Sequence, residues 1–211
     1  MARYSVRAWR NLRAEPSAPA SATTVVVAGT DATGRCRVLG LDPGSRRTGY
    51  GVVDCAGGQQ LHVASGCINV SGADLVTRLR RIYEAIAALV EAHRPDEVAI
   101  ERVFMHRNAD SALKLGQARG AALCGALILP APVHEYAPRA IKLAVTGYGA
   151  AEKSQVAQMV VTLLGLARRP QADAADALAV ALCHAQTRRL TALLRLPAPR
   201  RVVGTRAGLR S

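Results

Sequence analysis

The hydrophobic positions of the chain change period several times, from the two-residue alternation that is typical of strands to the three- and four-residue spacing of helices. Three β-rich runs joined by Pro, Gly and Ser come first, at 37–42, 50–54 and 60–70, and predict an antiparallel meander. The period changes over 74–93, where apolar residues at helical spacing predict an amphipathic helix: Leu75, Leu79, Ile82, Ile86, Leu89 and Val90.

Beyond this helix the pattern alternates between strand and helix. Two further strands are predicted at 97–101 and 133–136, and further helices at 109–129, 138–145, 152–164 and 172–186. Such alternation is the signature of an α/β layer architecture. We therefore expect one domain over 35–186, with a mixed five-stranded sheet flanked by helices on both faces.

The two ends of the chain show no such pattern. Residues 1–34 combine an Arg-rich start with an Ala-, Ser-, Thr- and Pro-rich stretch, which predicts a disordered extension. A start codon assigned too far upstream and an Arg-rich targeting segment are two explanations for it. Residues 187–211 are rich in Arg and broken by Pro and Gly, which predicts a flexible basic tail that either contacts phosphates or only aids solubility.

The formal net charge of +13 lies mostly at these ends, with +4 in 1–37 and +7 in 187–211. This distribution suits nucleic acid binding, but a soluble domain with basic tails would show it too.

The five cysteines are scattered without a C-x-x-C motif, which argues against a disulfide framework and a structural zinc site. We interpret them as small core residues in a reducing, cytoplasmic compartment. No apolar run reaches about 18 residues, so a membrane function is not expected.

Acidic residues fall where a ligand site would form. Asp42 ends the first strand and Glu101 ends the strand at 97–101. Ligand sites in open α/β sheets lie outside the carboxyl ends of the strands. Asp173 and Asp176 share one face of the last helix, and the alanines around them allow that helix to lie close to the sheet.

Each acid alone has an ordinary explanation, as a turn residue, a solvated strand end or a first-turn acid that complements the helix dipole. Together they would repel one another unless a cation compensates their charge. An all-oxygen site without a His or Cys cluster suits Mg²⁺ or Mn²⁺. Two such ions would activate a water and stabilise the leaving oxygen of a phosphodiester.

Four segments carry a resemblance to a known family: LGLDPGSRRTGYGVVD, AIERVFMHRNADSALKLGQARG, TGYGAAEKSQV and PQADAADALAVAL. In this order and spacing, over roughly residues 37–186, they resemble the bacterial RuvC family of Holliday-junction resolvases. The first segment is less specific, because actin-like ATPases and YqgF-type nucleases open in the same way. An ATPase of that kind would need two such domains, for which 211 residues leave no room. A catalytically silent, basic DNA-binding module is the other alternative.

The resemblance implies a ribonuclease-H-like fold and a homodimer. It also implies divalent-metal-dependent cutting of two strands of a four-way DNA junction in recombination and DNA repair, with RuvA and RuvB as partners. The metal is expected to be Mg²⁺, with Mn²⁺ as a substitute. Carried over position by position, the catalytic and metal-binding acids are Asp42, Glu101, Asp173 and Asp176.

The resemblance also indicates DNA contacts. Phe104 would stack on an unpaired base at the open centre of the junction, although a core role is the ordinary alternative. Lys142 and Lys153 would contact phosphates near the acids, although both could be ordinary solvated lysines. Arg107 is a further candidate, read only from its position beside Phe104.

The predicted helix over 109–129 carries a stripe of small residues, formed by Ala112, Gly116 and Gly120. Such a stripe permits close approach of another helix, either inside the chain or, as the resemblance implies, across a two-fold dimer interface. The histidines without metal-ligand spacing, which we interpret as structural, are His106, His134 and His184.

Overall fold

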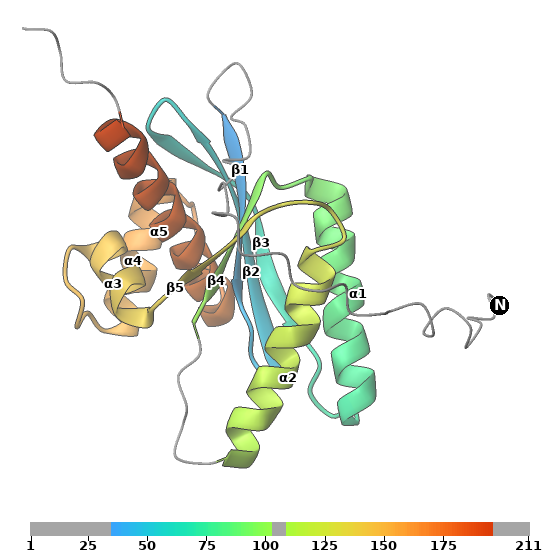
Figure 1. The fold of residues 1–211 in the computed structure, drawn as a ribbon. Helices are drawn as coiled ribbons and strands as arrows, with labels where there is room; N and C mark the ends of the chain where they lie inside the picture. The colour runs from blue at the N-terminus through green and yellow to red at the C-terminus, as the bar shows by residue number, and fades with distance from the viewer. Residues whose placement is uncertain (1–34, 103–108, 196–211) are drawn as a thin grey trace, which may run out of the picture.

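The structure is a computed structural model that describes residues 35–102 and 109–195, and this part of the chain forms five strands and five helices (Figure 1). The strands are β1 (Cys36–Asp42), β2 (Arg47–Ala56), β3 (Gln59–Asn69), β4 (Glu97–Glu101) and β5 (Val133–Tyr136). The helices are α1 (Leu75–His93), α2 (Ala109–Ala126), α3 (Pro138–Thr146), α4 (Lys153–Leu164) and α5 (Ala172–Arg195). Every element predicted from the hydrophobic pattern is present, in the predicted order.

The strands form one sheet in the order β3-β2-β1-β4-β5. β1 pairs antiparallel with β2, and β2 pairs antiparallel with β3, which confirms the predicted meander. β4 pairs in parallel with both β1 and β5, as crossover connections through helices require. The sheet is therefore mixed, and the carboxyl ends of β1 and β4 lie at the same edge.

Helices cover both faces of the sheet, with α1 and α2 on one face and α3, α4 and α5 on the other (Figure 1). The alternation of side chains along β1 assigns them to two cores. Val38 packs with Leu178 of α5, whereas Leu39 and Leu41 pack with Ile82 of α1. Odd and even positions of the strand thus contact different helical layers.

Glycines allow α5 to lie against the strands at very short range. A methyl group at Gly40 of β1 would overlap the backbone oxygen of Ala177, and one at Gly49 of β2 would overlap the backbone oxygen of Asp173. A side chain at either position would therefore push the helix away from the sheet. Glycine inside a strand is a known signal of close backbone approach, and this signal is present in the sequence.

Two sequence-based expectations differ from the structure. α5 continues past its predicted end at 186 to Arg195, so the first part of the predicted tail is helical. Arg is a good helix former, and Arg188 binds Glu97 of the sheet, which explains the extension. Cys124 is exposed and is not a core residue, unlike Cys36 and Cys183.

The remaining expectations for the chain ends stay predictions. The proposed extension over 1–34 and residues 196–211 of the proposed tail lie outside the described residues. Within the described ranges, no helix combines the length and the apolar character needed to cross a membrane.

Candidate active site

Three of the four predicted acids converge at one edge of the sheet. Asp42 ends β1 and Glu101 ends β4, and these parallel strands are in register at Leu41 and Ile100, so the two carboxyl groups are neighbours. Asp176 approaches them from α5, and its charge acts on both. The site is thus built from two strand ends and one helix.

Crowding changes the protonation of these carboxyl groups. Burial, followed by the charges of Glu101 and Asp176, raises the pKa of Asp42 from 3.8 to about 7. Burial raises the pKa of Glu101 as well, and the charge of Asp176 adds to this shift. Ionising all three groups is therefore costly unless a cation compensates them.

The fourth predicted acid, Asp173, lies beside β2 and β3. Its Oδ2 atom is 3.9 Å from Nη1 of Arg47 and 3.5 Å from Sγ of Cys67. It is the charge of Asp176, one turn further along α5, that acts on Asp42. The helix therefore places one aspartate against β1 and β4 and the other at the adjacent rim of the site.

The two predicted DNA-contacting lysines, Lys142 and Lys153, lie near these acids. Lys153, at the start of α4, donates a hydrogen bond from Nζ to Oδ2 of Asp176 at 2.8 Å, although most of its side chain is exposed. The positive charge of Lys142, on α3, lowers the pKa of Glu101 and so offsets part of the rise that burial causes. Both lysines bring positive charge to the edge of the sheet where the acids meet, and their contact with DNA stays a prediction.

The other two predicted DNA contacts, Phe104 and Arg107, fall between β4 and α2 and lie outside the described residues. The stacking role of Phe104 and the phosphate contact of Arg107 therefore stay predictions.

Sequence reasoning also missed part of the site. Arg47 of β2 and Cys67 of β3 contact Asp173 because α5 packs on these strands, which the sequence alone does not reveal.

Replacing Asp42 with Asn should stabilise the protein at about pH 8 when no divalent metal is present, by roughly 1–3 kcal/mol in the free energy of unfolding. The pKa of Asp42 is about 7 in the folded protein against a reference value of 3.8, so ionisation opposes folding. This penalty is complete above the folded pKa and disappears below the unfolded one. The gain should therefore shrink as the pH falls from about 8 to about 4, measured by urea unfolding.

The control for this experiment is Asp96→Asn, which removes one acid from outside the candidate site. Asp96 accepts a hydrogen bond from the backbone N–H of Arg37, and it lies at the opposite end of the sheet from Asp42. Its replacement should bring no stabilisation at any pH. Equal stability of Asp42→Asn and the unmodified protein at about pH 8 would contradict the crowding of the carboxyl groups.

Comparison with known proteins identifies the family. The sequence model of the family described as "Crossover junction endodeoxyribonuclease RuvC" matches residues 38–184. The chain belongs to the RuvC family. The matched range contains all four predicted acids, Asp42, Glu101, Asp173 and Asp176, and leaves both ends of the chain outside the RuvC match.

Individual RuvC proteins are similar over most of their length. The RuvC of Shewanella sp. (strain ANA-3) is 57% identical over 150 residues, which cover 71% of this chain and 87% of the relative. That of Methylococcus capsulatus is 59% identical over 148 residues, covering 70% of this chain and 89% of the relative. The structure of Thermus thermophilus RuvC in complex with Holliday junction substrate superposes with a TM-score of 0.70 at 36% identity, covering 74% of this chain and 96% of that one. These similarities confirm the predicted ribonuclease-H-like fold.

Proposed function

We propose that this protein is a structure-specific endonuclease that resolves four-way DNA junctions during recombination and DNA repair. Membership of the RuvC family supports the junction as substrate, since the Thermus relative was solved with a Holliday junction. The observation that carries the catalytic part is the convergence of Asp42, Glu101 and Asp176 at the carboxyl ends of β1 and β4.

The residues at this edge fit a divalent metal. Every donor that they offer is a carboxylate oxygen, which is the ligand type that Mg²⁺ and Mn²⁺ prefer. Asp42, Glu101, Asp176 and, from the rim, Asp173 would hold the ions, whose charge would offset both the burial and the carboxylate repulsion that raise the pKa of Asp42. When bound, Mg²⁺ would supply an activated water and stabilise the leaving oxygen of the cut phosphodiester.

The basic side chains around the acids would position the DNA backbone. Lys153 contacts Asp176 and is mostly exposed, so it can exchange this hydrogen bond for one to a phosphate oxygen when the carboxylate binds metal. Lys142 lies close enough to Glu101 for its charge to act on that carboxyl group. Arg107 and Phe104 would add a phosphate contact and a stacking contact next to β4.

We also propose a homodimer, because two symmetric active sites would cut two strands of a junction that itself has near two-fold symmetry. The small-residue stripe on α2 supports this arrangement. Gly116 and Gly120 are exposed, and a methyl group at either position would meet no atom of the described residues within 4 Å beyond its own neighbours and the adjacent backbone of the helix. Leu113 on the same helix is 62% exposed. As the family resemblance implies, the dimer would act in the cytoplasm with RuvA and RuvB.

The purified protein should cut a synthetic four-way junction into two nicked duplexes in the presence of Mg²⁺ and should leave a linear duplex of the same sequence intact. Cleavage should stop in EDTA and return with added Mg²⁺ or Mn²⁺, because the carboxylate site needs the ion. Gel analysis of end-labelled strands measures both cuts. Binding of the junction without cutting under all metal conditions would instead support a silent DNA-binding module.

A further inference from the structure

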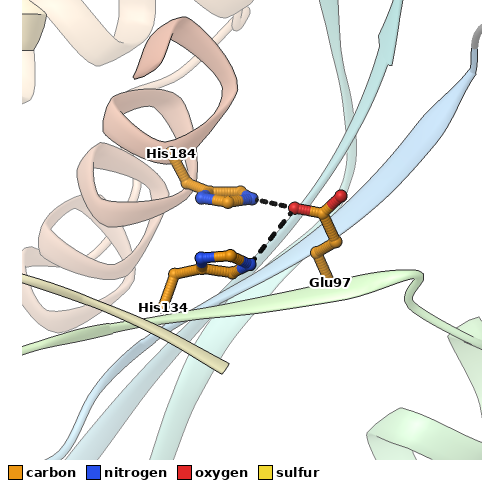
Figure 2. Close-up of side chains that lie close together, drawn as sticks. All are labelled: Glu97, His134 and His184. Atoms are coloured by element: carbon orange, nitrogen blue, oxygen red, sulfur yellow. Dashed lines mark hydrogen bonds and ion pairs between the residues drawn. The ribbon is translucent and has the colours of Figure 1, made fainter. Parts of the chain in front are cut away.

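A second cluster of titratable side chains lies on the face of the sheet that α5 covers. It consists of Glu97 at the start of β4, His134 on β5 and His184 on α5, whose possible ligand atoms all lie within 4.8 Å of one another (Figure 2). Glu97 and His184 are only 5% and 2% exposed. Glu97 precedes Glu101 by four residues on the same strand, or roughly 13 Å at about 3.3 Å per residue, so this cluster is separate from the candidate active site.

We propose that Glu97, His134 and His184 form a binding site for a Zn²⁺ ion. Two imidazole nitrogens and one carboxylate oxygen are a common donor set for zinc, whereas Mg²⁺ prefers oxygen ligands alone. Three protein ligands leave a fourth tetrahedral position for water. The proposed ion takes no part in the junction cleavage proposed above, and nothing in that reaction requires it.

The two imidazole nitrogens already point at one carboxylate oxygen of Glu97. Nε2 of His184 lies 2.5 Å from Oε2 of Glu97, and Nε2 of His134 lies 3.5 Å from the same oxygen (Figure 2). The latter nitrogen is buried and has no hydrogen-bond partner among the described residues. A buried polar atom without a partner is costly, and coordination of a metal would satisfy it.

The hydrogen bonds around the cluster suit a metal site. The hydroxyl of Tyr136 lies 2.7 Å from Nδ1 of His184. A hydroxyl can both donate and accept a hydrogen bond. Nδ1 of His184 can therefore carry the imidazole proton and donate a hydrogen bond to the Tyr136 hydroxyl, while Nε2 binds the ion.

The third ligand is anionic and held in place. The Glu97 carboxylate is hydrogen-bonded to His184 and Arg188. Nε of Arg188 contacts Oε1 at 2.8 Å, and at Oε2 the ion would replace the hydrogen bond with Nε2 of His184. The positive charge of Arg188 opposes a second cation nearby, so we expect micromolar rather than nanomolar affinity for Zn²⁺.

A metal at this position would join three elements that are far apart in the sequence. It would clamp the middle of α5 to β4 and β5, eight residues beyond Asp176 on the same helix. Binding to the folded state alone would stabilise the protein as the Zn²⁺ concentration rises. The proposed role is therefore structural.

Zn²⁺ should be titrated into the purified full-length protein at neutral pH, in competition with a chromophoric chelator. One ion per chain is expected to bind the unmodified protein and to raise its Tm. His134→Ala should weaken binding at least tenfold and abolish the Tm shift, while Mg²⁺-dependent junction cleavage persists. His134 is the best position for the test because it is partly exposed and its Nε2 makes no hydrogen bond with the described part of the chain.

Two controls distinguish this site from others. His62→Ala removes an exposed histidine on β3 and should leave Zn²⁺ binding unchanged. The double variant Asp42→Asn, Asp176→Asn removes carboxylates of the candidate active site and should also retain the ion. The proposal is overturned if the unmodified protein binds no Zn²⁺, if His134→Ala binds it equally well, or if only the double variant loses it.

Discussion

Replacing Asp176 with Asn should lower the rate of Mg²⁺-dependent junction cleavage by about a thousandfold, which corresponds to roughly 4 kcal/mol in activation free energy. Asn keeps the size of the side chain but removes the charge that acts on Asp42 and Glu101. Asp173→Asn should cost about a hundredfold, because Asp173 lies at the rim, beside Arg47. Single-turnover cleavage at saturating Mg²⁺ measures both effects, and junction binding in Ca²⁺ should persist.

The matched control for these variants is Asp110→Asn. Asp110 is a first-turn acid of α2, as Asp173 is of α5, but it is exposed and pairs only with Lys114 among the described residues. A first-turn acid that merely complements the helix dipole contributes about 0.3–1 kcal/mol to stability and nothing to the cleavage rate. If Asp176→Asn and Asp173→Asn cut junctions as fast as Asp110→Asn does, the four-carboxylate site is wrong and only DNA binding remains.

Gly49→Ala should destabilise the protein by about 3 kcal/mol and reduce cleavage at least tenfold. The added methyl group would overlap the backbone oxygen of Asp173, which cannot move without shifting the start of α5. Gly49 pairs directly with Asp42 across β1 and β2, so the displacement occurs beside the acids. Urea unfolding and junction cleavage in Mg²⁺ measure the two losses.

Gly149→Ala is the control for this substitution. A methyl group there would meet the side chain of Arg139, which is exposed and can move aside, so the free energy of unfolding should change by less than about 1 kcal/mol. Equal stability of Gly49→Ala and the unmodified protein would show that α5 does not rest on the backbone of β2. The close approach of α5 to Gly49 would then be incorrect.

Local patterns in the sequence determined the secondary structure of this protein and the family to which it belongs. The change from two-residue to helical period predicted every described element, and the alternation along a strand placed Val38, Gly40 and Asp42 on one face. Asp42 and Glu101 could be assigned to strand ends because the strand period and the following turn depend only on neighbouring residues. The motifs then indicated the RuvC family, which the comparisons confirm.

Only the tertiary structure decided which side chains meet. α5 lies across the whole sheet, so it brings Asp176 to Lys153 near its start and His184 to Glu97 near its middle. Partners separated by tens of residues leave no periodic signal, and His134 and His184 therefore looked like isolated structural histidines. The extension of α5 to Arg195 was equally hidden, because the contact of Arg188 with Glu97 exists only once the helix has packed on β4. Contacts between distant segments depend on the packing of the whole domain, and a single sequence does not specify them locally.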